Sequence, residues 1–444
     1  MNKNEIYRIY GTNYKEMTVR LLTECNLSAQ IMGKFQRPIC PGISPKIPSS
    51  KSLLSDMASV PDRSNIRIGI KPNLVSPTPA SFGATTHPGI VAGIIEYLQM
   101  HGFTNIIILE GSWVGDRTSE AFEYCGYNEL SRRYNVPLFD MQKDTSFTAD
   151  CSGLQLKICS KLQDIDYLIN APVLKGHCQT RVTCALKNMK GLIPNSEKRH
   201  FHSMGLHKPI AHLNTYIHQD FIVIDHICGD PDIEDGGNPL VRNCIMAAVD
   251  PVLTDAYACR VLGYSADDVR YITLAAGLGV GSSDLGSLHM INVPGDEDST
   301  QYEELERQFD KTDEDSSEIS DAHRIVSLNY AVEEVDSCSA CYSYLMSALD
   351  RLKSEGLLSR LTDELNIRFC IGQGYRRSGD TSDDANNACM KHHSGTSESS
   401  SPCTESECLN YIGIGACTRA FEKNIPGCPP SEDDIYDYLV NLLP

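Results

Sequence analysis

A cluster of basic, hydroxyl and amide side chains follows an apolar segment in the stretch 166–191, DYLINAPVLKGHCQTRVTCALKNMKG. Its members are Lys175, His177, Thr180, Thr183, Lys187 and Asn188. Lysines, hydroxyls and the amides of a helix N-terminus are the groups that bind a carboxylate or a phosphate. The stretch therefore predicts a site for a small anion, with Lys175, His177 and Lys187 as catalytic candidates. A solvated basic helix face remains the alternative.

Two further polar positions come directly after apolar runs. Lys71 and Asn73 follow the run that ends at Ile70, and Glu110 follows the run 106–109. Side chains at the carboxyl ends of parallel strands face the crevice in which ligands of α/β proteins lie. We expect Lys71 and Asn73 to contact the substrate and Glu110 to transfer a proton, with turn chemistry and a solvated acid as the respective alternatives.

Cysteines with the spacing of cluster ligands lie near the C-terminus. They are Cys338 and Cys341 in a C-x-x-C motif, Cys417 in IGIGACT and Cys428 in PGCPP. Two thiols three residues apart can bind one metal centre, and two later thiols can complete a four-thiolate site. The pattern predicts a four-iron, four-sulfur cluster (4Fe–4S), with structural zinc or unligated thiols as alternatives. Whether Cys370 is a ligand stays open.

Four histidines, at positions 200, 202, 207 and 212, lie close together in the sequence. They lack the HExxH spacing of a zinc site and no C-x-x-C motif lies beside them. Histidines that line the anion crevice are the better interpretation.

Alternating apolar segments indicate how these residues are positioned. We expect strands near 6–10, 66–70, 106–109, 136–139, 167–169, 221–225 and 289–293, with helices over 14–25, 89–101, from Thr180 onward, and after Asp250. Thr85 and Thr86 are expected to cap the second of these helices. Strand and helix alternate, which favours an α/β fold with a doubly wound, mostly parallel sheet.

Composition shifts divide the chain. Residues 1–295 form the predicted α/β domain, in which the Pro- and Ser-rich segment 33–65 reads as an insertion loop. Residues 296–325 are an acidic linker, and 326–444 a small cysteine-rich domain. The polar segment 376–411 inside it is interpreted as a disordered insertion.

The net charge of −19 argues against broad binding of nucleic acid or anionic lipid, and no apolar run reaches membrane-spanning length. Without a secretory signal we expect a cytoplasmic protein with no membrane partner. Eighteen cysteines in a reducing compartment indicate buried thiols and metal ligation rather than disulfides.

Several motifs resemble a known family. They are KPNLV at 71–75, the threonines before His87, LEG at 109–111, LKGHCQTRVTCALKNMKG at 174–191, DPVLTDA at 250–256 and LGVG at 278–281. In this order they resemble the family catalogued as domain of unknown function 362, over residues 5–295. The tail resembles the cysteine-rich ends of members thought to carry an iron–sulfur cluster. The resemblance implies a fold and a cluster, and no reaction.

Together these patterns predict an iron–sulfur oxidoreductase or electron carrier that acts on a small anionic substrate and has an electron-transfer partner. A non-redox lyase or isomerase with one open iron is an alternative. A non-catalytic binding protein with structural zinc is another.

Overall fold

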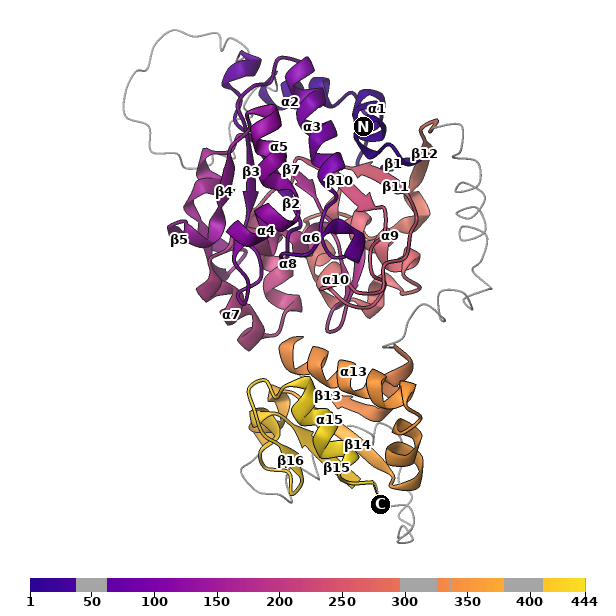
Figure 1. Ribbon diagram of the computed structural model, residues 1–444. Coiled ribbons are helices and arrows are strands. Elements are labelled where there is room, and N and C mark those ends of the chain that lie inside the picture. Colours follow the sequence, from indigo (N-terminus) through magenta and orange to yellow (C-terminus); the bar gives the residue numbers. More distant parts are fainter. Residues whose placement is uncertain (37–61, 296–325, 336, 338, 379–409, 444) are drawn as a thin grey trace.

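The computed structural model describes residues 1–36, 62–295, 326–335, 337, 339–378 and 410–443, which form two units (Figure 1). The larger unit is built on an eight-stranded sheet with the order β12-β1-β11-β10-β7-β2-β3-β4. Among these strands only β11 runs against the others, because its pairs with β1 and β10 are antiparallel and the remaining pairs are parallel. The prediction of a mostly parallel sheet is confirmed.

The strands of this sheet are β1 (Glu5–Tyr10), β2 (Ile68–Pro72), β3 (Ile106–Glu110), β4 (Leu138–Asp140), β7 (Tyr167–Ala171), β10 (Phe221–His226), β11 (Cys244–Ala248) and β12 (His289–Asn292). The helices around it are α1 (Tyr14–Glu24), α2 (Leu27–Gln36), α3 (Pro88–Met100), α4 (Thr118–Tyr124), α5 (Tyr127–Tyr134), α6 (Ala185–Asn188), α7 (Asn195–Met204), α8 (His207–Tyr216), α9 (Pro251–Val261) and α10 (Arg270–Gly277). Two hairpins are added, β5 (Ser146–Cys151) with β6 (Leu154–Cys159), and β8 (Lys175–His177) with β9 (Arg181–Thr183).

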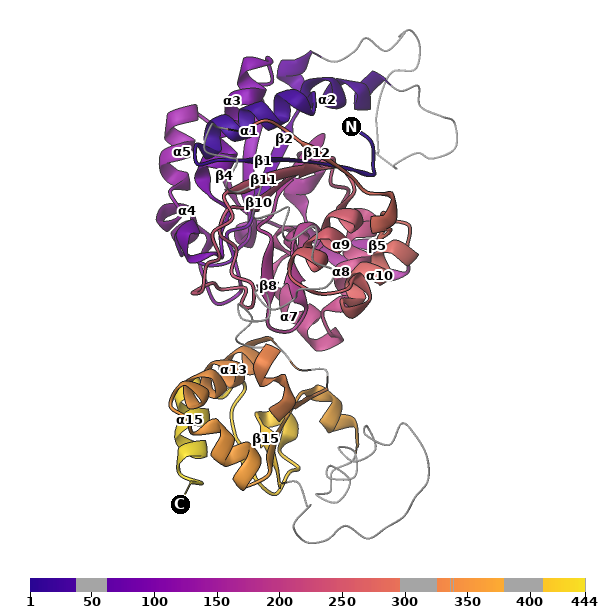
Figure 2. The same cartoon turned by 90° about the vertical axis from the view of Figure 1, so that its right-hand side faces the viewer.

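Both faces of the sheet are covered, as a doubly wound fold requires. One apolar core joins α1 to α5 to the sheet, and a second joins α6 to α10 and the β5–β6 hairpin to its other face (Figure 2). Neighbours along a strand alternate between them: Ile108 lies in the first core and Leu109 in the second. Strands buried on both faces read as continuous aliphatic runs, which is why the sequence located them.

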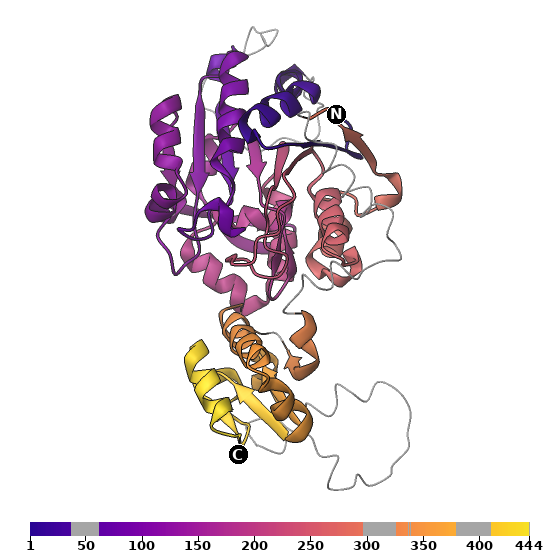
Figure 3. The same cartoon turned by 45° about the vertical axis from the view of Figure 1, so that its right-hand side comes forward.

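The smaller unit has its own parallel sheet, in the order β13-β14-β15-β16. Its strands are β13 (Val332–Glu334), β14 (Ile367–Ile371), β15 (Asn410–Ile414) and β16 (Asn424–Ile425), and its main helices are α13 (Ser339–Ser354) and α15 (Glu432–Val440). Leu345, Leu349 and Leu352 of α13 are fully buried in its core. Figure 3 shows α13 on the side of this unit that faces the larger one.

The predicted helix from Thr180 is wrong. Residues 181–183 form strand β9, and the helix begins only at Ala185. Val182 and Leu186 have the spacing of one helix face. However, the β-branched residues Thr180, Val182 and Thr183 favour an extended chain, and pairing with β8 stabilises that conformation.

Two other expectations differ from the structure. Strand β11 was not predicted, although it joins β1 to the rest of the sheet. Helix α3 is capped by the His87 side chain, which accepts a hydrogen bond from the amide of Gly89 at 3.0 Å. The Thr86 hydroxyl instead donates to the carbonyl of Ala171 on β7, so this threonine ties two strands together.

Some predictions fall on residues outside those described. The insertion loop predicted at 33–65 contains residues 37–61, which are not described, whereas α2 continues to Gln36. The acidic linker 296–325, most of the segment 376–411 and Cys338 also lie outside the described residues. Within the part of the chain that is described, no helix is long and apolar enough to cross a membrane.

Candidate functional site

The point at which the strand order reverses locates the crevice of the large sheet. From β2 the chain moves outward through β3 to β4, and it then returns to β7 on the opposite side of β2. The carboxyl ends of β2 and β7 therefore diverge into loops on different faces, which is where open α/β sheets bind ligands. Lys71 and Asn170 are direct neighbours there.

A cavity of about 230 Å³ opens at these strand ends. The sequence-predicted residues that line it are Lys71, Asn73, Glu110, Lys175, His177, Thr183, Lys187 and Asn188. Thr180 does not line it, because its hydroxyl donates to the carbonyl of Val182 inside the hairpin. Five lysines and three carboxylates face the cavity, so its wall is cationic in an otherwise acidic protein.

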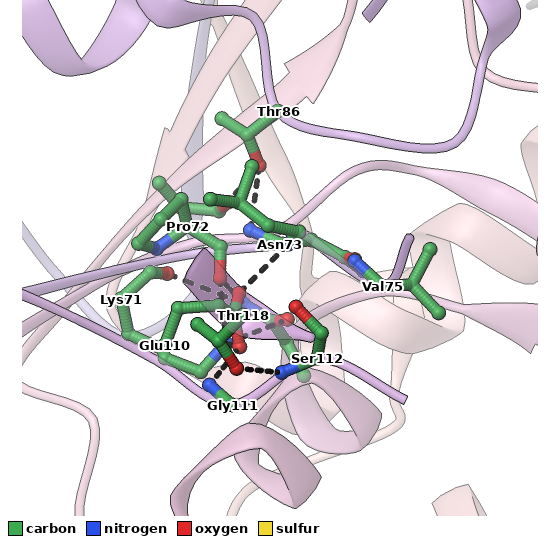
Figure 4. A network of polar contacts seen from close by, with 12 residues as sticks. Lys71, Pro72, Asn73, Val75, Thr86, Glu110, Gly111, Ser112 and Thr118 are labelled. Carbon is green, nitrogen blue, oxygen red and sulfur yellow. Dashed lines mark hydrogen bonds and ion pairs between the residues drawn. The ribbon is translucent and has the colours of Figure 1, made fainter. Parts of the chain in front are cut away.

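Lys71 and Glu110 form a buried ion pair at the floor of the cavity (Figure 4). Lys71 Nζ lies 2.8 Å from Glu110 Oε1, and the two side chains are 1% and 2% exposed. Burial lowers the pKa of Lys71, an effect that Glu110 opposes. Glu110 also accepts from the amides of Leu74 and Gly111, each at 2.7 Å. With its oxygens occupied in this way, Glu110 is arranged to hold Lys71 and two loops rather than to exchange a proton.

Gly191 makes room for this pair. A Cβ at that position would lie 2.3 Å from Lys71 Cε and 2.5 Å from Glu110 Oε1. Asn188 completes the floor, because its amide donates to Asn170 of β7 at 2.7 Å and to the carbonyl of Lys71 at 3.2 Å. Asn188 therefore joins α6 to both strands at the switch point.

Lys175 and Lys198 are held by main-chain oxygens. Lys175 Nζ donates to the carbonyls of Ala84 and Glu234, both at 2.5 Å. Lys198 Nζ donates to the carbonyls of Gly111 and Ser112 at 2.8 and 2.7 Å. Burial lowers the pKa of each lysine to about 8. Both ammonium groups therefore have acceptors and add positive charge to the wall.

Lys187 and Lys190 have fewer contacts. Lys187 Nζ lies 3.1 Å from the Thr183 hydroxyl, and burial lowers its pKa well below the ordinary value. Lys190 makes no hydrogen bond or ion pair with the described residues. Burial lowers the pKa of Lys190 to about 8. These two lysines are the ones that remain available to a ligand.

Two buried polar atoms at the cavity also lack a partner among the described residues, Ser112 Oγ and His202 Nδ1. Burial lowers the pKa of His202 to about 3, so its imidazole is neutral. An unsatisfied buried polar atom costs about 1–3 kcal/mol, which a ligand that bonds it recovers. Of the four histidines expected in the crevice, only His202 lines the cavity. His200, His207 and His212 instead contact Glu197, the amide of Tyr271 and the carbonyl of Cys151. The sequence did not predict Ser112 or Lys198 at the cavity, because only the fold brings them there.

The acidic loop after β10 forms one wall. Glu234 and Asp235 line the cavity, and burial raises the pKa of Asp235 to about 6. His177 Nε2 lies 3.2 Å from Glu234 Oε1, and the Cys178 thiol lies 3.4 Å from the same oxygen. Gly176 permits this approach, because a Cβ there would lie 2.1 Å from the carbonyl oxygen of Pro231.

His177, Cys178 and Glu234 approach one another closely enough to hold a metal ion. However, His177 Nδ1 accepts from the amides of Gln179 and Thr180 at 3.0 and 3.2 Å. The neutral ring therefore carries its proton on Nε2, which donates to Glu234 and has no lone pair for a metal. The group is a hydrogen-bonded set that fixes His177 against the acidic loop.

The amides at the start of α6 are not an anion site. Asp255 of α9 is fully buried and accepts from the amide of Ala185 at 2.7 Å and from that of Leu186. The interpretation that these amides receive the ligand is therefore wrong. Burial raises the pKa of Asp255 to about 7. Asp255 therefore joins α9 to the start of α6.

The smaller unit completes the cavity. Ser343 and Tyr344, in the first turns of α13, contribute to its lining. The Gln179 side chain donates to the carbonyl of Ser337, and Gln373 donates to the carbonyl of His202 at 3.1 Å. The ligand site is thus built from both units.

The described cysteines of the tail lie on segments that meet. A Cβ on Gly415 would lie 3.4 Å from Cys341 Sγ and 3.4 Å from the carbonyl oxygen of Gly427. The amide of Ala416, next to Cys417, donates to that same carbonyl, next to Cys428, at 2.7 Å. These contacts bring together the segments that carry Cys341, Cys417 and Cys428. Within the described chain, however, the set of metal-ligand atoms found within 4.8 Å of one another is that of His177, Cys178 and Glu234, and it does not include these cysteines. Cys338 lies outside the described residues.

Cys370 faces away from them. Its neighbours in β14, Phe369 and Ile371, share the core that contains Cys341, whereas Cys370 packs with Tyr375 and Phe421 in a separate apolar cluster. Successive side chains of a strand point to opposite faces. Cys370 therefore packs in a different apolar cluster from Cys341.

Comparison with known proteins agrees with the motifs noted in the sequence. Residues 68–260 match the family model described as Domain of unknown function (DUF362), a narrower span than the 5–295 expected. The chain is 28% identical over 143 residues to the thylakoid-associated protein sll1697 of Synechocystis sp.. This match covers 31% of the chain and 42% of that protein, less than half of the relative's length.

Proposed function

We propose that the chain is an iron–sulfur oxidoreductase or electron carrier acting on a small anionic substrate. Its residues 68–260 match the model of the domain of unknown function 362 family, which supplies no reaction, so the proposal rests on the cavity and on the tail cysteines. The observation that carries the proposal is the position of α13. Cys341 lies in its first turn, and Ser343 and Tyr344 immediately after it line the cationic cavity. Cys341 itself packs in the core of the smaller unit, so a cluster there would lie on the other side of α13, one helix diameter (~10 Å) from the cavity.

The cavity supports the anionic character of the substrate. Lys175 and Lys198 are ammonium groups whose main-chain acceptors carry no formal charge. Lys190 has no partner among the described residues. In a site largely excluded from water, such charges bind an anion more strongly than exposed lysines do. A cavity of about 230 Å³ suits a small molecule.

Cys338, Cys341, Cys417 and Cys428 would hold the 4Fe–4S cluster, which supplies one-electron transfer when bound. The contact of the Gly415 segment with both the Cys341 sulfur and the Gly427 carbonyl supports this assignment for the described part of the set. An electron-transfer partner is implied, because a single cluster passes electrons on. The buried thiols of the larger unit, such as Cys25, Cys151 and Cys259, form no disulfide, which supports a reducing compartment such as the cytoplasm.

The test is metal and sulfide analysis of protein purified without oxygen. We expect about four irons and as many acid-labile sulfides per chain, with a visible absorption band that reduction bleaches. Cys417→Ser should lose most of this iron, whereas Cys228→Ser, a half-buried thiol hydrogen-bonded to the carbonyl of Ala80, should keep it. Colourless protein without iron would overturn the redox proposal, and stoichiometric zinc would favour the structural-zinc alternative.

The anion site is tested separately by fluorescence. Trp113 is the single tryptophan of the chain and lines the cavity, so its emission reports binding directly. We expect malate to change this emission and a neutral diol of similar size to leave it unchanged. Lys190→Met should weaken malate binding, whereas Lys208→Met, at an exposed position of α8 outside the cavity, should not. Equal responses to malate and the diol would contradict an anion site.

A further inference from the structure

The lysines of the cavity differ in what their amino groups contact. A buried ammonium needs acceptors for its protons. Lys71 has the Glu110 carboxylate, and Lys175 and Lys198 each have two carbonyl oxygens. These three lysines are satisfied as cations.

Lys187 lacks acceptors of this kind among the described residues. It is 7% exposed, and among the described residues its Nζ has one hydrogen-bond partner, the Thr183 hydroxyl at 3.1 Å. No carboxylate or carbonyl oxygen receives its protons within the described chain. A hydroxyl can donate to an amine as well as accept from an ammonium. The contact therefore suits a neutral amine whose lone pair is oriented by Thr183.

Burial of Lys187 acts in the same direction. Burial is the main cause that lowers the pKa of Lys187; among the neighbouring charges Glu234 raises this pKa most, and Lys190 and Lys175 lower it. A desolvated lysine beside other cations is the arrangement that makes an amine nucleophilic at neutral pH. The amine faces the cavity, where a substrate has access to it.

We propose that Lys187 is a catalytic nucleophile that forms an imine with the carbonyl carbon of a small anionic substrate, such as a 2-oxo acid. This inference rests on the anion site of the proposed function and narrows its substrate to carbonyl compounds. The Nζ lone pair forms a bond to the carbonyl carbon, and the carbonyl π electrons move to oxygen. Loss of that oxygen as water takes both hydrogens of the amine, so no oxidant or reductant is needed.

Neighbouring groups provide for the rest of such a substrate. Lys190 is available to the carboxylate, being three residues along from Lys187 and without a partner in the described chain. Ser112 Oγ and His202 Nδ1 are buried, face the cavity and have no partner among the described residues. The hydroxyl can donate to the substrate, and the neutral His202 can relay the protons that leave as water.

The test is reductive trapping on the full-length protein. Pyruvate and oxaloacetate are each added with sodium borohydride, which reduces an imine to a stable secondary amine. Trypsin cleaves after Arg181 and Lys190 but not after a modified Lys187, so the adduct should appear on the peptide VTCALKNMK, residues 182–190. Malate, which has no carbonyl group for the amine to attack, should give no adduct. At saturating pyruvate, which compensates for any change in anion binding, trapping should increase as pH rises, since a larger fraction of the Lys187 amine is then neutral.

Variants check the assignment. Lys187→Met and Lys187→Arg should lose the adduct, and Lys208→Met should retain it. An adduct on another lysine, or none on wild-type protein, would overturn the imine. If malate still alters Trp113 emission while trapping fails, the imine is wrong and the anion site stands. If neither malate nor a 2-oxo acid binds, both the imine and the anion site are wrong. Iron analysis of the same sample tests the cluster independently.

Discussion

Replacing Glu110 by glutamine should destabilise the larger unit strongly, because it leaves the Lys71 ammonium buried without a counter-ion. Lys71 and Glu110 are 1% and 2% exposed, and their charged atoms are 2.8 Å apart. Glutamine keeps the shape of the side chain and an oxygen that can accept from Leu74 or Gly111. The change therefore removes the charge together with one of the two amide hydrogen bonds, and the double variant with Lys71→Met separates the contribution of the charge.

The magnitude follows from distance and burial. With an effective dielectric constant of about 20, two unit charges at this separation attract by about 6 kcal/mol. Part of this attraction offsets the desolvation of both ions, and removing one partner of a buried pair typically costs about 3–5 kcal/mol. We expect a loss in that range for Glu110→Gln. Lys71→Met combined with Glu110→Gln should recover about 2–3 kcal/mol of it.

Lys15 and Glu96 provide a matched control. Their separation is 2.9 Å, but their side chains are 33% and 34% exposed. Glu96→Gln should therefore cost no more than about 1 kcal/mol. For every variant, urea unfolding followed by Trp113 emission measures the free energy of unfolding of the larger unit, which contains both ion pairs. Equal losses for Glu110→Gln and Glu96→Gln would show that burial of the first pair has no energetic consequence.

Three further predictions use other parts of the site. Burial raises the pKa of Asp255 from 3.8 to about 7, so the native state holds the extra proton between these values and wild-type stability should fall as pH rises from about 4 to 7. Asp255→Asn should remove this slope in urea midpoints, and parallel slopes would contradict the assignment. Anion binding should weaken between pH 7 and 9 as Lys190, with a pKa of about 8, loses its charge; a pH-independent malate titration would disagree. Gly176→Ala should push the Pro231 carbonyl away and weaken malate binding, whereas Gly277→Ala, with nothing within 4 Å, should have no effect.

Much of the fold could be predicted because it depends on local pattern. Aliphatic runs such as 106–109 are long enough to identify strands buried on both faces, and polar residues directly after them lie at the crevice edge. That is why Lys71, Asn73 and Glu110 were placed correctly at the cavity. The cap of α15 is equally local, because Ser431 bonds the amide of Asp434 three residues along the chain.

Other parts of the site depended on residues far apart in the chain. Asp255 caps α6 across 70 positions, and Ser337 receives Gln179 across 158. Neither contact can be predicted from the local spacing of residues in the sequence. The same is true of Lys198, whose carbonyl partners lie 86 and 87 positions away.

The sequence by itself determined the parallel α/β class, the strand ends that carry cations, and the thiols available to a metal centre, because hydrophobic period and residue type act locally. Only the tertiary structure decided which charges are neutralised. It paired Glu110 with Lys71, gave main-chain acceptors to Lys175, and left Lys187 with a single hydroxyl. The reason is physical: the protonation state and reactivity of a side chain depend on its desolvation and its nearest charges, and packing sets both.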